Sequence, residues 1–252
     1  MSQEAPNAKQ ATAGGLRAAV LFDVRGDLRF LSHRDEMRML MRAATRAQWP
    51  LQYSRGFNPQ PRISLPLPRP VGQSSTSELA IFWLRDPISN DELARELSAA
   101  LPPLAPLREL HCPATPGSPK PLEADFCVRL EGVDAPLAAR CRELMNAPNI
   151  WVDRARGPQR AAQRVDVRPF LQELSVEDDG LRMTLKYDDQ RSARPAEVLE
   201  CLGIEDDGAL EVCRVRVRWD RPLDGPACAS LTKKGCCIGN EEEHTKHVHP
   251  HA

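Results

Sequence analysis

The sequence predicts an α+β protein built from two tandem ferredoxin-like domains, each a four-stranded antiparallel sheet backed by two helices. Three observations support this prediction. The order β-α-β-β-α-β can be read twice along the 252 residues, once in each half. A stretch rich in proline and glycine, residues 114–122, separates the two runs and is the predicted linker. The composition, 41% hydrophobic and 27% charged, is that of a globular chain with room for two small domains.

The first domain is predicted over residues 16–113. Two short apolar stretches surround an Arg-Gly-Asp turn, and Ser32 is then the expected N-cap of an amphipathic helix over 33–48. Pro50 ends this helix. The prolines of the segment 55–72, here called the signature loop, favour an ordered extended loop over a helix or a central strand. The remaining elements are short strands at 51–54, 78–84 and 107–112, and a helix that opens at the capping residue Ser89 and runs to Leu101.

The second domain is predicted over residues 123–222. Along its last strand, Val212, Val215 and Val217 alternate with arginines, which indicates one buried and one exposed face. The halves share no evident residue identity, so the repeat is one of architecture. The expected strands are 125–130, 150–152, 165–174, 181–187 and 210–219, and the expected helices are 136–145 and 195–202.

Composition excludes several classes of protein. The chain has 34 Lys and Arg against 35 Asp and Glu, no apolar run near the ~18 residues of a membrane span, and a polar start without a secretory signal. It also lacks the Walker, G-x-G-x-x-G, H-E-x-x-H, G-x-S-x-G and CxxxCxxC motifs. We therefore expect a soluble cytoplasmic protein with no membrane contact that is not a self-sufficient enzyme of a familiar class. Cys127, Cys141 and Cys213 are expected to be small buried hydrophobes.

The first helix and the segment around it are basic. Residues 16–70 contain ten arginines against four acidic residues, in a chain whose net charge is −1. Four of the arginines recur at every fourth position and form a stripe on the outer face of the helix: Arg34, Arg38, Arg42 and Arg46. Such a stripe suits a phosphate backbone, and an ordinary solvated helix face is the alternative.

The segment that leads into the signature loop interleaves aromatic, cationic and amide side chains. Rings for stacking, beside guanidinium groups and amides, are what recognition of single-stranded RNA requires. The alternative is a proline-stiffened structural loop whose Phe57 plugs the core. The side chains concerned are Tyr53, Arg55, Phe57, Asn58, Gln60 and Arg62.

Two motifs connect the chain to a known family. The F-L-S-H-x-D entry to the first helix, followed by Y-S-x-G-F-N-P-x-P-R-I-S and L-P-x-P-x-G, resembles the radical-SAM-linked proteins, a bacterial family of unknown function, over residues 28–72. Val165–Pro169 resembles a second motif of that family. The resemblance implies a radical-SAM enzyme as partner and a role in RNA modification or processing. Arg34 replaces the usual Leu, and Gln60 stands where His is common.

His33 is a weak catalytic candidate. Tandem ferredoxin-like domains with a His at the start of the first helix also resemble CRISPR-repeat endoribonucleases, in which such a His is a general acid or base. Tyr53 or Arg29 could serve as its partner. The structural alternative is a His that caps the helix or bonds the loop.

These features lead to three hypotheses. The first is an RNA-binding or substrate-presenting accessory partner of a radical-SAM enzyme. The second is a metal-independent endoribonuclease that uses His33. The third is a docking module that contacts only the radical-SAM protein. For RNA or partner binding, the predicted residues are Arg29, His33, Arg34, Arg38, Arg42, Tyr53, Arg55, Phe57, Asn58 and Arg62.

The two ends of the chain are predicted to be flexible. Residues 1–15 form a polar leader, and 223–252 form a Cys- and His-rich tail with too few apolar residues to fold by burial. Thiolates and imidazoles together suit Zn²⁺, and no other cofactor is expected. The expected ligands are Cys236, Cys237, His244 and His247.

Overall fold

The structure is a computed structural model that describes residues 16–112, 114, 117–130, 134–155, 161–189, 191–205 and 210–223. The predicted leader 1–15 lies outside the described residues, as does the predicted tail from residue 224 onward. No helix in the described part of the chain is long and apolar enough to cross a membrane.

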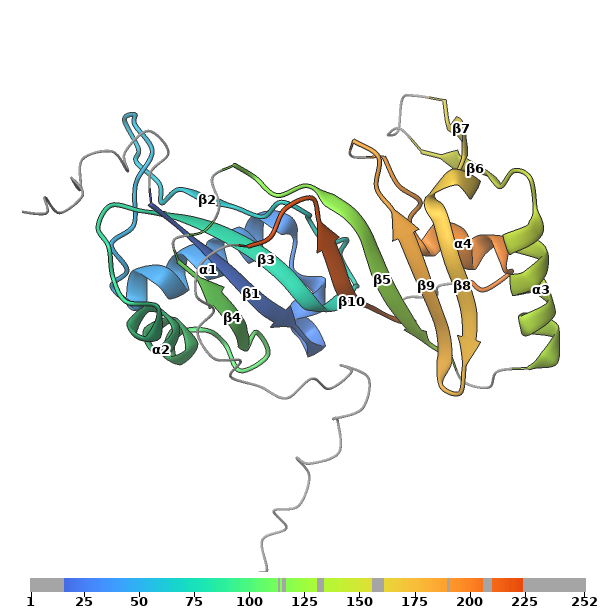
Figure 1. Ribbon diagram of the computed structural model, residues 1–252, viewed down its shortest axis with the longest axis horizontal. Coiled ribbons are helices and arrows are strands. Elements are labelled where there is room, and N and C mark those ends of the chain that lie inside the picture. The colour runs from blue at the N-terminus through green and yellow to red at the C-terminus, as the bar shows by residue number, and fades with distance from the viewer. Residues whose placement is uncertain are drawn as a thin grey trace, which may run out of the picture.

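The first half has the predicted β-α-β-β-α-β order, with a 3-10 helix, η1, in place of the second apolar stretch (Figure 1). The predicted strand 51–54 was wrong: the second strand is β2, at Ile63–Ser64, and Leu51 and Tyr53 form isolated bridges because Tyr53 pairs back with Pro61 within the loop. Ser32 and Ser89 cap the two α-helices as predicted, each accepting a hydrogen bond at 3.2 Å from the backbone N–H three residues on. The elements are β1 (Leu16–Val24), η1 (Gly26–Phe30), α1 (His33–Arg46), β2 (Ile63–Ser64), β3 (Ser74–Leu84), α2 (Asn90–Ala100) and β4 (Leu107–His111).

The second half contains more strands, β5 to β10, than the four of the predicted β-α-β-β-α-β pattern. The predicted strand 165–174 is two strands separated by a 3-10 turn, so that prediction was wrong. The elements are β5 (Pro121–Arg129), α3 (Ala135–Asn146), β6 (Trp151–Arg154), β7 (Gln163–Asp166), η2 (Arg168–Phe170), β8 (Leu171–Glu177), β9 (Gly180–Lys186), α4 (Pro195–Cys201) and β10 (Glu211–Trp219).

The turn between β7 and β8 is built by the second motif. Asp166 Oδ1 accepts hydrogen bonds from the backbone N–H groups of Ile150 at 2.9 Å and Arg168 at 3.0 Å. The Arg168 guanidinium then donates to the carbonyls of Met145 and Ala147 at the end of α3. These bonds satisfy carbonyls that a helix end leaves without partners, so the motif has a structural role.

The two halves share one eight-stranded sheet rather than forming two separate four-stranded sheets. Its order is β4-β1-β3-β10-β5-β9-β8, with β2 also paired to β3, while β6 and β7 form a separate ribbon. The junction is a short parallel pairing of β10 with β3 at Cys213↔Ser74 and Arg214↔Ser75. Because β2 covers only the end of β3, opposite Ile81 and Phe82, the start of that strand edge is open to β10.

Each half has its own apolar core. In the first half, alternate residues of β1 pack against α1, whose Leu40, Ala43 and Ala44 are fully buried. Trp49 closes this core with an edge-on contact to Phe82 at 5.1 Å between ring centroids. The second core gathers β5, β8, β9, α3 and α4, and includes the ribbon residue Val152.

The burial of Arg214 departs from the predicted alternation of buried valines and exposed arginines along β10. Arg214 is 2% exposed, whereas Arg216 and Arg218 are exposed as predicted. The sheet register shifts between Arg214 and Arg216, and Arg214 lies where β10 joins β3. Its guanidinium pairs with Glu78 Oε1 at 2.6 Å and donates to the Leu67 carbonyl at 3.0 Å. The joining of the halves therefore buries a position that would be exposed in a separate domain.

Candidate nucleic-acid interface

A groove of about 530 Å³ lies between α1 and the loop that follows it. We call it the α1 groove. The structure thus brings together the arginine stripe and the aromatic loop, two features that the sequence could not place relative to each other. Its lining residues are Arg38, Met41, Arg42, Thr45, Arg46, Tyr53, Pro59, Gln60 and Pro61.

The α1 stripe is exposed, as predicted, but its arginines differ in what they contact. Arg38 pairs with Asp35 at 3.0 Å, and Arg46 donates to the Ala100 carbonyl at 2.6 Å. Arg42 has no hydrogen-bond or ion-pair partner within the part of the chain that the structure describes. Hydrogen bonds from Ser32 and Arg38 lower the pKa of Asp35, which keeps that carboxylate charged and bound to Arg38. Arg42 is therefore, of the three arginines that line the groove, the one most available to an incoming anion.

The loop opposite the stripe is a closed hairpin held by backbone hydrogen bonds. Tyr53 pairs with Pro61 as an isolated bridge, and the Ser54 N–H donates to the Gln60 carbonyl at 2.8 Å. The Ser54 hydroxyl in turn accepts from the Gln60 N–H at 3.0 Å. Gly56 has a φ of +147°, which L-residues rarely adopt. The loop is thus an ordered element, as the sequence indicates.

Phe57 lies at the tip of this hairpin and is fully exposed. The alternative in which Phe57 plugs the core is wrong. The neighbouring Arg55 and Asn58 are also exposed. These three side chains do not line the α1 groove, whereas Tyr53, which is 44% exposed, does.

Arg62 contacts the side chains of Trp83 and Gln52 and does not line the α1 groove. Its guanidinium lies 5.0 Å from the centre of the Trp83 ring on β3, and Nη1 donates to Gln52 Oε1 at 2.8 Å. Arg17 lies 5.2 Å from the centre of the same ring. Arg62 therefore anchors the base of the hairpin to the sheet.

His33 and its predicted partners are not brought together. His33 is exposed at the first position of α1 and makes no hydrogen bond or ion pair with any described residue. Ser32, and not His33, caps the helix. Arg29 lies in η1 with its guanidinium 4.8 Å from the centre of the Phe30 ring. Arg34, the remaining predicted residue, is exposed one position after His33.

Sequence reasoning missed a buried polar network beneath the interface. Arg69, near the end of the signature loop, is 3% exposed and donates to the carbonyls of Leu28, Arg29, Pro70 and Gln73. It also pairs with Glu36 at 3.4 Å. Arginine is rarely buried, so the composition of the loop gives no signal for this role. The position of Glu36 did indicate a buried polar group, because Glu36 lies four residues before Leu40 on the apolar face of α1.

Burial raises the pKa of Glu36 to about 7, and the nearby Glu78 adds to this effect. The attraction of Arg69 and Arg214 opposes the shift without cancelling it. Glu36 Oε1 has no hydrogen-bond partner among the described residues. The network therefore contains one carboxyl group that folding prefers to hold protonated.

The predicted metal site cannot be placed. Cys236, Cys237, His244 and His247 lie outside the described residues, and the described ranges contain no group of three or more His, Cys, Asp or Glu side chains that could hold a metal. Cys127, Cys141 and Cys213 are buried, as predicted.

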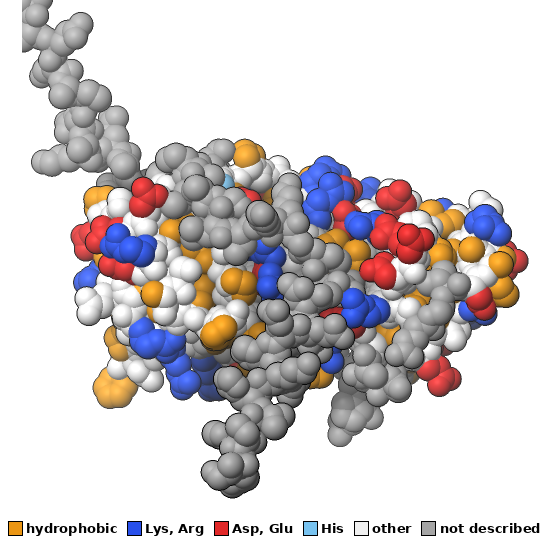
Figure 2. All heavy atoms as spheres, turned by 90° about the horizontal axis from the view of Figure 1, so that it is seen from below, with side chains coloured by type: hydrophobic (Ala, Val, Ile, Leu, Met, Phe, Trp, Pro, Cys, Tyr) orange, Lys and Arg blue, Asp and Glu red, His pale blue; other side chains and the backbone are white. Residues whose placement is uncertain are grey.

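Charge is dispersed over the face drawn in Figure 2, where basic and acidic side chains are interspersed on both halves. This distribution agrees with the net charge of −1. The α1 groove, lined by three arginines, is thus a local concentration of basic side chains in a chain of nearly neutral charge.

A search among curated proteins finds no match for this chain. A family model matches residues 17–195, a span that includes the α1 groove, the signature loop, the buried Arg69 and the β6–β7 ribbon. The chain therefore belongs to the bacterial family described as uncharacterized protein conserved in bacteria (DUF2344).

Proposed function

We propose that this protein is an RNA-binding, substrate-presenting accessory partner of a radical-SAM enzyme in RNA modification or processing. The observation that supports it is the α1 groove, which combines three arginines with the Tyr53 ring and two prolines. The proposal of a radical-SAM partner rests on the resemblance of residues 28–72 to the radical-SAM-linked proteins. We also propose that the halves are two ferredoxin-like units, because β4-β1-β3-β2 and β10-β5-β9-β8 place equivalent strands in the same order.

The groove suits a single strand. The Cβ atoms of residues four apart on a helix lie about 6 Å from each other, so Arg38, Arg42 and Arg46 project from one face of α1 and line one wall. Tyr53 on the opposite wall offers a ring for one base. Pro59 and Pro61 reduce the freedom of the loop that holds this ring, which lowers the entropic cost of binding.

Docking to a protein partner is the second candidate, and the exposure of Phe57 favours it. A fully exposed aromatic side chain at the tip of a closed hairpin is a typical anchor for a pocket on another protein. In that case the binding of the radical-SAM enzyme depends on Phe57, and the α1 groove binds no RNA. His33 has no partner for general acid–base chemistry among the described residues, so the endoribonuclease hypothesis gains no support.

The test is a titration of labelled single-stranded RNA at several salt concentrations, with fluorescence anisotropy as the readout. Loss of two phosphate contacts on a single strand lowers the log–log salt slope by about 1.4. We expect this change in Arg38→Ala/Arg42→Ala. Arg140→Ala is the matched control, because Arg140 is an exposed helix arginine in the second half. A double variant with the wild-type slope, or no RNA binding at all, contradicts the proposal.

A further inference from the structure

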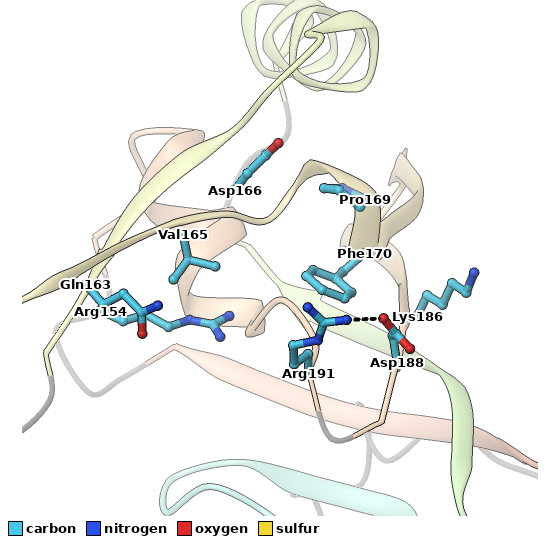
Figure 3. A pocket seen from close by; sticks show the side chains of 9 residues that line it. All are labelled: Arg154, Gln163, Val165, Asp166, Pro169, Phe170, Lys186, Asp188 and Arg191. Carbon is cyan, nitrogen blue, oxygen red and sulfur yellow. Dashed lines mark hydrogen bonds and ion pairs between the residues drawn. The ribbon is translucent and has the colours of Figure 1, made fainter.

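A second cavity, of about 470 Å³, lies in the other half of the molecule beneath the β6–β7 ribbon (Figure 3). Its size is within the range of small-molecule sites. None of the residues predicted to bind RNA lines it. It therefore needs an explanation independent of the α1 groove.

The ribbon presents one of its two faces to this cavity. Strand alternation and the pairs Val152↔Val165 and Arg154↔Gln163 put these four residues on one face. Val152 is buried in the core of the second half, and the other three side chains line the cavity. Phe170, on η2, is 8% exposed and adds an aromatic wall. One wall is therefore apolar, formed by Val165 and Phe170.

Two arginines line the cavity. In Figure 3 the Arg154 guanidinium points toward Arg191, whose own guanidinium is turned to Asp188. Arg154 uses Nε and Nη2 to bind Glu197, and Nη2 also donates to the Ser192 carbonyl, so Nη1 has no partner among the described residues. Within the same described residues, the Arg191 guanidinium binds Asp188 through Nη2.

The Arg191–Asp188 pair is easily exchanged. Their side chains are 71% and 56% exposed, and exposed ion pairs contribute little to stability. An incoming phosphate can therefore replace Asp188 at modest cost. Lys186, which has no hydrogen-bond or ion-pair partner among the residues described, stands at the rim and adds a third positive charge.

A further carboxylate at the cavity, beyond the Glu197 and Asp188 that already pair with the arginines, does not compete for these cations. Asp166 also borders the cavity, but in Figure 3 its carboxylate points away from the two arginines. Hydrogen bonds from Asn149 at 2.7 Å and from the Ile150 backbone at 2.9 Å hold it there.

We propose that this cavity binds a nucleoside monophosphate unit, with the phosphate between Arg154 and Arg191 and the base against Val165 and Phe170. Guanidinium pairs match the geometry of a phosphate, and the apolar wall suits a planar base. The unit is either a free nucleotide or the 5′-phosphorylated end of an RNA.

The experiment is isothermal titration of the full chain with AMP, GMP, CMP and UMP, and with inorganic phosphate. We expect at least one nucleotide to bind and Arg191→Gln to weaken it about tenfold or more. Arg182→Gln is the matched control, because Arg182 also forms an exposed pair, with Glu177, on the same half but outside the cavity. Equal affinities for Arg191→Gln and wild type, no binding of any nucleotide, or equally tight binding of inorganic phosphate each overturns the proposal.

Competition then identifies the source of the ligand. A short RNA with a 5′-phosphate and the same RNA with a 5′-hydroxyl are added to the nucleotide complex. Displacement by the phosphorylated RNA alone supports the site and assigns it to RNA ends. Displacement by neither supports the site and assigns it to free nucleotides. Equal displacement by both overturns the proposal, because the terminal phosphate is then not what the arginines recognise.

Discussion

Residues 53–72 contain two regions with opposite environments. Residues 53–62 form a solvent-facing hairpin whose tip residue, Phe57, contacts no core, whereas the Arg69 side chain is buried and bonded to η1 and α1. Both regions contain arginine and proline, and neither residue type by itself indicates which arginine is buried. The comparison teaches that one motif can combine a binding element with the structural support beneath it.

Replacing Arg69 with Met should produce the largest effect. The change removes donors from four carbonyls and leaves Glu36 without its nearest counter-charge. Breaking a buried pair in this way costs about 3–5 kcal/mol. Urea unfolding measures the loss. Arg55→Met is the matched control, because Arg55 is exposed in the hairpin 53–62, and it should change the free energy of unfolding by less than about 0.5 kcal/mol. Equal losses in the two variants would remove the distinction between the regions.

Glu36→Gln should change the pH dependence of stability. Because the folded pKa of about 7 lies above the ordinary 4.5, the wild type loses stability as pH rises from 4.5 to 7 and stays level above that. The full shift corresponds to about 3 kcal/mol. The variant has no titrating group at position 36. Its free energy of unfolding should therefore depend less on pH over this interval and should exceed that of the wild type above pH 7. Thermal unfolding across pH 4 to 9 tests this, and parallel curves would contradict a raised pKa.

Tyr53→Leu should weaken RNA binding while leaving the fold intact. Stacking of one base on an aromatic ring contributes about 1–3 kcal/mol, so we expect the affinity for single-stranded RNA to fall about fivefold or more. The salt slope should not change, because no phosphate contact is removed. This separates Tyr53 from Arg42, whose loss should lower the slope. Anisotropy titrations at two salt concentrations distinguish the two effects.

Much of the architecture follows from local sequence signals. The serine caps, the amphipathic period of α1 and the buried cysteines depend on neighbours within a few residues, and all were predicted correctly. The groove could be predicted only in part: Arg38, Arg42 and Tyr53 were identified, but not that they line one groove together with Pro59 and Pro61. The burial of Arg214 and the joining of β10 to β3 depend on contacts between residues far apart in the chain. Short-range periodicity contains no information about such contacts.

Phe57→Ala should have the smallest effect on stability and is the sharpest test of the exposed region. A fully exposed ring contributes no burial, so the free energy of unfolding should stay within about 0.5 kcal/mol of wild type. A loss above 1 kcal/mol would mean that the ring packs against the protein in solution. Binding measurements then decide what the tip contacts. If Phe57 supplies a second stacking surface next to Tyr53, RNA affinity falls several-fold. If it anchors the radical-SAM enzyme, RNA affinity is unchanged and binding of that enzyme is lost.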